Sequence, residues 1–322
     1  MFDYLGVGVL VLLAALFGWL VTRAWGAQQA WLKWLGAGVA GTLTLISGAI
    51  LVIALIGFYR LNAKQPNAAA DIRVAGTPEQ VARGAQLAQI CAGCHGGGQL
   101  PLTGQNALSE GAPPIGTLYV PNLTMAGEMK DWTDGEIIRA IREGVHQDGR
   151  SLLIMPSAVF RNMSDADAHA LVAYLRSTTA GEASPPTRLN LLGALFIGAG
   201  LFPLSAQPPL ESAVAAPPAG VTKEYGAYLV SIAACTECHG PDLAGQPENP
   251  NGLPGGPNLT TLVPQWTEAQ FLAFFNTGQT PAGATMSESM PWKEVRGFAS
   301  DDDLRAMYLY LSALPPQAGP SE

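Results

Sequence analysis

All four cysteines of this 322-residue sequence stand in two copies of one short motif, Cys-x-x-Cys-His. The cysteines and histidines of the two motifs are Cys91, Cys94, His95, Cys235, Cys238 and His239. Two residues between the cysteines allow one helical turn to bring both thiols to one edge of a porphyrin, and the adjacent histidine then points at the metal. The pattern is typical of covalent haem c attachment, in which two thiols add to vinyl groups and the histidine binds iron.

Two other kinds of site use closely spaced cysteines, and neither explains the whole pattern. A thioredoxin-like redox pair needs neither the histidine that follows nor a second copy of the motif. A zinc site built from both pairs leaves the two histidines unexplained. We therefore predict two covalently bound haem c groups, and no cysteine remains for a disulfide.

Each motif is followed by a methionine that could supply the sixth iron ligand. Met155 and Met290 both precede a proline, and they lie 60 and 51 residues after the motif histidines. A thioether favours ferrous iron and raises the reduction potential relative to a second imidazole. A lone methionine more often fills a gap in a core, but the repeated position favours a ligand here. The predicted axial ligands are His95, Met155, His239 and Met290.

A second methionine, Met286, lies close to Met290, so distance from the motif does not separate the two. The distance from the repeated tryptophan does separate them. Met290 stands 24 residues after Trp266, and Met155 stands 23 residues after Trp132. We therefore predict that Met290, not Met286, binds the second iron.

Two histidines lie outside the motifs. They are His146, in the segment GVHQDGR, and His169, on the polar face of a predicted helix. Neither has a counterpart in the second copy, so we expect both to be solvated.

The motifs belong to an internal repeat. Both copies then contain PNLT, a tryptophan followed by threonine, the dipeptide MP and an apolar helical segment. In the first copy these lie at 121–124, 132–133, 155–156 and 171–177, and in the second at 257–260, 266–267, 290–291 and 307–314. The two copies are therefore expected to share one fold.

The same three helix starts recur in each copy. The predicted N-caps are Thr77, Thr133 and Ser164 in the first copy and Thr222, Thr267 and Ser300 in the second. Gly84 with Tyr174, and Gly226 with Tyr310, are expected where the first and last helices cross. Glycine- and proline-rich loops separate the helices, without a convincing alternating strand pattern. The predicted fold class is all-α.

Two long uncharged segments stand at the N-terminus. Residues 4–22 are 19 and residues 34–59 are 26 consecutive residues without a charge, and each can cross a hydrocarbon core of about 30 Å. The eleven residues between them carry two positive charges, and tryptophans cluster nearby. The start MFDY has no basic residue, which argues against a cleaved signal peptide. We predict a transmembrane hairpin with its turn in the cytoplasm.

A third apolar stretch, residues 189–204, is only 16 residues long and lies within a proline- and alanine-rich segment. A single crossing here would place the two haem motifs in different compartments. We therefore expect a buried or interfacial segment. The predicted organisation is a hairpin at 1–60, haem domains at 61–182 and 222–322, and a linker at 183–221.

Composition limits the classes of function. Only 13% of the residues are charged, and the mean hydropathy is +0.20, consistent with a segment in lipid. Seventeen basic and 25 acidic residues give a net charge of −8, which argues against nucleic acid as a partner.

Several segments of both copies resemble a known family. Segments such as PIGTLYVPNLT, WTDGEIIRAIREGV and MSDADAHALVAYLRS in the first copy, and YGAYLVSIAACTECHG and DLRAMYLYL in the second, are similar to membrane-bound multihaem cytochromes c. The cytochrome subunits of periplasmic alcohol and sugar dehydrogenases are among these. The resemblance implies two tandem class I cytochrome c domains with histidine and methionine on iron. Those subunits hold three haems and lack the long hairpin.

The expected function is single-electron transfer at the bacterial cytoplasmic membrane, with both haem domains on the periplasmic face. The donor would be a membrane or periplasmic protein, and the acceptor a respiratory or photosynthetic one. Expected partners are an integral membrane electron-transfer complex or dehydrogenase and a redox protein. The alternatives are a dihaem subunit of a periplasmic dehydrogenase and a dihaem peroxidase. Two protein ligands on each iron leave no position for substrate, so we expect no catalytic residues.

Overall fold

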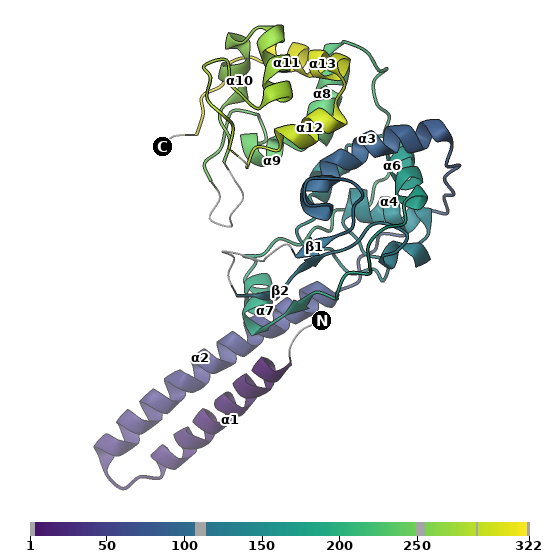
Figure 1. Ribbon diagram of the computed structural model, residues 1–322. Coiled ribbons are helices and arrows are strands. Elements are labelled where there is room, and N and C mark those ends of the chain that lie inside the picture. Colours follow the sequence, from purple (N-terminus) through teal and green to yellow (C-terminus); the bar gives the residue numbers. More distant parts are fainter. Residues whose placement is uncertain (1–3, 107–113, 249–254, 288, 321–322) are drawn as a thin grey trace. The chain divides into compact units, whose positions relative to one another are not determined.

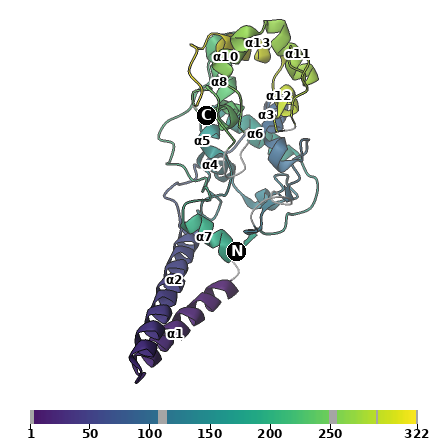
Figure 2. The same cartoon turned by 90° about the vertical axis from the view of Figure 1, so that its left-hand side faces the viewer.

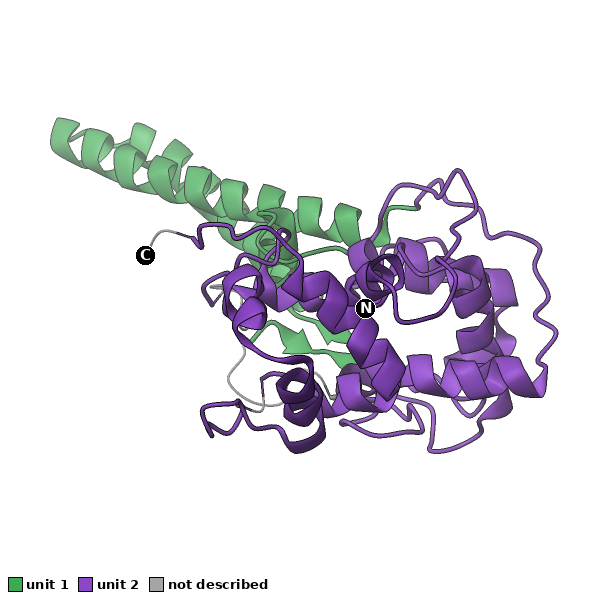
Figure 3. Ribbon diagram, turned by 90° about the horizontal axis from the view of Figure 1, so that it is seen from above, with its two compact units in different colours: residues 1–64, 108–119, 186–204 green, residues 65–107, 120–185, 205–322 purple. Residues whose placement is uncertain are grey.

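A computed structural model describes residues 4–106, 114–248, 255–287 and 289–320. The chain divides into two compact units (Figure 3). The first comprises residues 1–64, 108–119 and 186–204, and the second comprises residues 65–107, 120–185 and 205–322.

The first unit is built on a helical hairpin (Figure 1). Helices α1 (Leu5–Trp25) and α2 (Ala30–Asn62) run antiparallel and pack along one another. Both are long and apolar enough to cross a membrane. Most of their large apolar side chains face outward, such as Leu12 at 71% and Leu45 at 76% exposure. Outward-facing leucines are stable in lipid but not in water.

The third apolar stretch forms α7 (Leu191–Gly198), which packs against the end of α2 (Figure 2). The helices meet where both carry glycine: a Cβ on Gly57 would stand 1.9 Å from the Ala194 carbonyl oxygen. A Cβ on Gly198 would be equally close to the Ile53 carbonyl oxygen. Arg60 also donates a 3.2 Å hydrogen bond to the Ile197 carbonyl at the end of α7. The segment is therefore a docked helix on α2 with a buried face.

The second unit holds both copies of the repeat. The first copy forms α3 (Pro78–His95), η1 (Glu128–Asp131), α4 (Asp134–Glu143), α5 (Ser157–Phe160) and α6 (Asp165–Ser177). The second copy forms α8 (Lys223–Ile232), α9 (Cys235–His239), α10 (Leu259–Leu262), η2 (Val263–Gln265), α11 (Glu268–Thr277), α12 (Trp292–Phe298) and α13 (Asp301–Ser312). Buried side chains from both copies form one continuous hydrophobic cluster.

The predicted helix starts are confirmed. All six predicted caps accept a hydrogen bond from a backbone N–H in the first turn: Thr77, Thr133, Ser164, Thr222, Thr267 and Ser300. Each satisfies a donor that the first helical turn leaves without a partner. Both α4 and α11 end at a glycine in the left-handed conformation, Gly144 and Gly278.

The first and last helices of each copy cross at glycine, as predicted. A Cβ on Gly84 of α3 would lie 1.9 Å from the Ala170 carbonyl oxygen and 2.7 Å from the Tyr174 Cβ in α6. A Cβ on Gly226 of α8 would lie 1.9 Å from the Ala306 carbonyl oxygen in α13. The first and last helices of both copies therefore pack closely at a glycine.

The described residues also form four strands of two residues each, which the sequence analysis did not predict. They are β1 (Gln105–Asn106), β2 (Gly116–Thr117), β3 (Tyr119–Val120) and β4 (Arg188–Leu189). In the first unit β2 pairs antiparallel with β4, with Gly116 opposite Leu189. Such short strands show no alternating pattern, so only the fold reveals them.

Candidate haem sites

Both motif histidines are held by a proline carbonyl group. The Nδ1–H of His95 donates to the Pro121 carbonyl oxygen at 3.0 Å, and that of His239 donates to the Pro257 carbonyl oxygen at 2.8 Å. Because a carbonyl oxygen only accepts, each ring has its proton on Nδ1 and presents Nε2 as the metal-binding nitrogen. The two copies thus hold their imidazoles in the same tautomer by the same contact.

The PNLT segments hold these carbonyl groups in place. The Asn122 side chain accepts from the Thr124 N–H at 2.8 Å, and the Asn258 side chain accepts from the Thr260 N–H at 3.0 Å. Both threonines are fully buried. The sequence analysis noted PNLT only as a repeated segment and missed its contact with the histidines. Its presence at equivalent places in both copies was the available signal.

Glycine allows the closest approach in the second copy. A Cβ on Gly256 would stand 2.8 Å from Nδ1 of His239 and 2.7 Å from the Cys238 carbonyl oxygen. A side chain at this position would push the Gly256–Pro257 backbone away from the imidazole, so glycine is required for the short hydrogen bond.

The attachment segments differ between the copies. In the first, α3 runs unbroken through Cys91 to His95. In the second, α8 ends at Ile232, Ala234 takes the left-handed conformation at φ 59°, and α9 begins at Cys235. The glycine of the helix crossing lies nine residues before the first cysteine here and seven in the first copy. The break accommodates those two additional residues.

The four cysteines, all within the described part of the chain, form no disulfide with one another. Burial raises the pKa of both Cys91 and Cys235 to about 12, so an unmodified thiol at either position remains neutral. Burial also lowers the pKa of His95 and His239, and this effect outweighs the hydrogen bonds to Pro121 and Pro257. Both imidazoles are therefore kept in the neutral form that binds metal.

The two predicted methionine ligands stand in equivalent backbone positions. Pro156 has φ −78° and ψ 54°, and Pro291 has φ −79° and ψ 53°. Each proline begins a short helix, α5 or α12, and the residue after it donates 2.8 Å from its N–H to the methionine carbonyl oxygen. Met155 and Met290 are both half-buried against the core.

Met286 instead matches Leu152. The Leu152 N–H donates to the Gly144 carbonyl oxygen at 2.7 Å, and the Met286 N–H donates to the Gly278 carbonyl oxygen at 2.8 Å. Both glycines end the corresponding helices α4 and α11. This register supports Met290 as the counterpart of Met155.

The residue before the first predicted methionine ligand has a strained backbone conformation. Ile154, directly before Met155, has φ 63° and a side chain that is 42% exposed. A β-branched residue rarely adopts this conformation, and strained residues cluster at ligand-binding positions. The strain and exposure of Ile154 are consistent with a loop conformation that positions the side chain of Met155.

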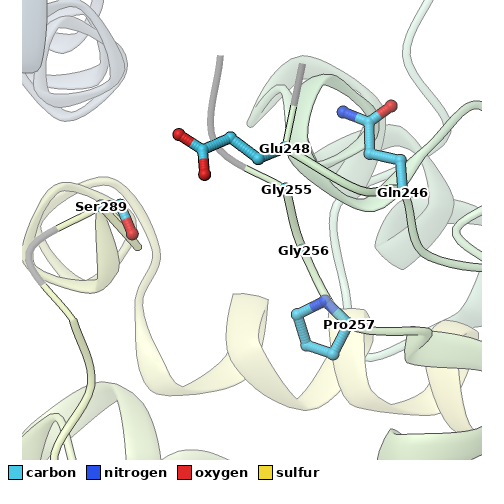
Figure 4. A pocket seen from close by; sticks show the side chains of 6 residues that line it. All are labelled: Gln246, Glu248, Gly255, Gly256, Pro257 and Ser289. Atoms are coloured by element: carbon cyan, nitrogen blue, oxygen red, sulfur yellow. The ribbon is translucent and has the colours of Figure 1, made fainter. Parts of the chain in front are cut away.

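A pocket of about 450 Å³ opens beside the second motif. It is lined by Gln246, Glu248, Gly255, Gly256, Pro257 and Ser289. Figure 4 shows Ser289 across the pocket from the loop that carries Glu248 and Gly255. Pro257 holds His239 on one side, and Ser289 precedes Met290 on the other. The pocket therefore lies between the segments that carry the two predicted ligands.

The expectation that His146 is solvated is wrong. Its side chain is only 14% exposed and meets the Trp132 ring edge-on, with ring centroids 4.8 Å apart. Nδ1 accepts a 3.2 Å hydrogen bond from the Asp148 N–H. The turn after α4 folds the ring back onto the tryptophan, a contact that local sequence does not show. His169 is partly exposed on α6.

These residues fit haem c. Two thiols could add to the haem vinyl groups, and a neutral imidazole with Nε2 available and a methionine thioether could bind the iron. The matched proline contacts give each histidine the outer hydrogen bond that orients a metal ligand.

Comparison with known proteins identifies the family of the chain. A family model described as Cytochrome c matches residues 81–179 and 224–315. The chain is 31% identical over 271 residues to a nicotinate dehydrogenase subunit of Pseudomonas putida, covering 73% of this chain and 22% of that protein. It is 28% identical over 270 residues to the alcohol dehydrogenase (quinone) cytochrome c subunit of Gluconacetobacter polyoxogenes, covering 73% and 56%. Identity to the corresponding protein of Gluconobacter oxydans is 26%.

The family model that matches describes haem proteins whose iron exchanges electrons. The chain belongs to the cytochrome c family, which confirms the resemblance seen in the sequence. It is an electron-transfer protein with covalently bound haem c. It spans about a fifth of its nicotinate dehydrogenase relative and a little over half of its alcohol dehydrogenase relatives.

Proposed function

We propose that the chain is a membrane-anchored dihaem cytochrome c with tandem domains at 61–182 and 222–322. The proposed thioether links are Cys91 and Cys94 in the first domain and Cys235 and Cys238 in the second. The proposed axial ligands are His95 with Met155, and His239 with Met290. The observation that carries the proposal is the matched pair of proline contacts, which prepares two histidines in the same way.

Bound haem would supply reversible one-electron exchange at iron. The protein groups set how readily that exchange occurs. The carbonyl groups of Pro121 and Pro257 fix the imidazole tautomer and make each ring a better donor. A methionine opposite each histidine favours the ferrous state. Two protein ligands per iron leave outer-sphere transfer as the reaction.

The hairpin supports attachment to the cytoplasmic membrane, with its turn in the cytoplasm. Near the turn, the Arg23 guanidinium lies 5.2 Å from the Trp19 ring centroid, and the Lys33 ammonium lies 4.7 Å from that of Trp25. Basic and aromatic side chains gather in this way at the cytoplasmic end of membrane helices. Two crossings would return the chain to the outer face. Helix α7 packs on α2 and has only 8 residues, which is too short for a further crossing.

Topology can be measured with a reporter inserted after Gly220, between the two haem motifs. We expect an export-dependent phosphatase to be active there and a cytoplasmic fluorescent reporter to be dark. The same pair inserted after Ala27, in the predicted turn, serves as the control and should give the reverse result. Activity restricted to the cytoplasm after Gly220 would contradict two crossings and a periplasmic second domain.

The electron donor that the comparisons favour is a periplasmic dehydrogenase. Two of the relatives described above are named as cytochrome c subunits of a quinone alcohol dehydrogenase, and another is named as part of a nicotinate dehydrogenase. A net charge of −8 favours a basic docking surface on the partner. We propose that a dehydrogenase reduces the haems, and that a respiratory or photosynthetic membrane protein reoxidises them.

A tagged chain extracted in mild detergent tests this assignment. We expect a dehydrogenase catalytic subunit to copurify and a dehydrogenase substrate, with ethanol and nicotinate as first probes, to reduce both haems. Peroxide turnover by the purified chain would instead support the dihaem peroxidase alternative. If no dehydrogenase copurifies and neither probe reduces haem, the dehydrogenase link is wrong.

A further inference from the structure

The two copies of the repeat meet through the elements that carry the proposed haem ligands. Helix α12, which starts two residues after Met290, packs against α3, which ends in the first attachment motif (Figures 1 and 2). Gly297 faces Gln89, two residues before Cys91, and a Cβ on Gly297 would stand 3.0 Å from that side chain. The helix that follows the proposed methionine ligand of the second copy therefore contacts the helix that carries the first attachment motif.

The contact continues along α3. The Arg83 guanidinium lies over the Phe298 ring of α12, 5.9 Å from its centroid. Close to the first motif, a Cβ on Gly98 would lie 3.3 Å from a carboxylate oxygen of Glu294. The two helices thus meet both along the body of α3 and just beyond His95.

A hydrogen-bonded group holds the copies together beside this contact. Arg83 forms a two-pronged ion pair with Asp167 of α6, with both N–O distances 2.9 Å. From the second copy, the Tyr228 hydroxyl of α8 donates to Oδ2 of this carboxylate at 2.7 Å. The Ser164 N–H donates in turn to the Tyr228 oxygen at 3.1 Å. Tyr228 thus links the second copy to Asp167 and Ser164 of the first.

Each member of the group requires the others. Asp167 is 8% exposed and Tyr228 is also 8% exposed, so neither is well hydrated. A buried carboxylate is stable only when its oxygens are paired and hydrogen-bonded. Burial and the Asp167 carboxylate both raise the pKa of Tyr228, which keeps its hydroxyl protonated as a donor. Separating the copies would break this group as well as the shared hydrophobic cluster.

We propose that Tyr228 and Asp167 are positioning residues that hold α12 against α3, and that this contact is the junction through which electrons pass between the two haems. The inference rests on the proposed function, because both copies must carry haem. Outer-sphere transfer requires the two centres to be held close and in fixed orientation. Here the two helices in contact adjoin the residues that would hold the cofactors, since α12 follows Met290 and α3 ends in the first attachment motif. A charged hydrogen-bonded group fixes their alignment.

The test uses the full-length holoprotein with the substitutions Tyr228→Phe and Gly297→Leu combined. The first removes the hydroxyl that reaches Asp167, and the second places a branched side chain against Gln89. Rapid photoreduction of one haem by a ruthenium dye, followed by haem-to-haem equilibration, gives the transfer rate. We expect the rate to fall about tenfold, because transfer needs the two copies aligned, and losing one hydrogen bond to a charged group shifts the equilibrium between the aligned and separated copies by about that factor. Haem content and methionine-to-iron absorption should stay at wild-type values.

Two further variants separate a junction from general stability. Tyr308→Phe is the matched control, because its hydroxyl donates at 2.8 Å to the Trp266 carbonyl oxygen within the second copy. It should leave the transfer rate unchanged. Gln89→Ala added to Gly297→Leu removes the side chain that the leucine meets, and it should restore most of the rate.

The outcomes are distinct. A wild-type rate in the combined variant with two haems bound would overturn the junction and leave the proposed function intact. An equal loss of rate in Tyr308→Phe would also overturn it, because the effect would then be one of stability. Only one haem in the wild-type chain would contradict the proposed function itself.

Discussion

Replacing Met290 with alanine is expected to abolish the methionine-to-iron charge-transfer absorption of the second haem and to lower its reduction potential. The thioether stabilises ferrous iron, and water or another weak donor would take its place. The drop should be on the order of 0.1 V, within the roughly 0.8 V range that axial ligands set. Redox titration of the two haems, followed by absorption, measures both effects.

Met286→Ala is the matched control for this experiment. It removes the same side chain four residues away, at the position that Leu152 occupies in the first copy. Both the absorption and the potential should stay nearly unchanged. If Met286→Ala abolished the absorption and Met290→Ala preserved it, the ligand assignment in the second domain would be reversed.

Local signals in the sequence predicted much of this architecture. A helix cap is made by one side chain and the N–H group two or three residues on, so Thr77 and Ser300 could be assigned from neighbours alone. The crossings at Gly84 and Gly226 were also predictable, since glycine recurs at one point of both first helices. The register of Met290 followed from the repeat in the same way.

Contacts between distant segments were not predictable in this way. The burial of His146 depends on Trp132, and the docking of α7 depends on Gly57, more than 130 residues earlier in the chain. The hydrogen bond to each motif histidine comes from a backbone carbonyl, which every residue carries, so residue type gives no indication of it. The role of Tyr228 depends on how the two copies meet.

The largest expected effect comes from removing one pair of haem-binding cysteines. Cys235→Ser combined with Cys238→Ser should reduce the covalent haem content from two groups per chain to one. The mass of the intact chain should fall by about one haem, because serine cannot form the thioether link. Haem absorbance per polypeptide provides an independent count.

The matched variant in the first domain, Cys91→Ser with Cys94→Ser, should also leave one haem, now on the second domain. The first cysteine of each pair packs against the core, so a variant without its haem is expected to be less stable and to accumulate less. Mass analysis of proteolytic peptides from the wild-type chain tests haem attachment without either variant, so the result does not depend on how well a variant folds. Peptides containing CAGCH and CTECH should each carry a haem mass. An unmodified peptide from either motif in fully matured protein would refute the assignment of two haems and leave a single-haem cytochrome.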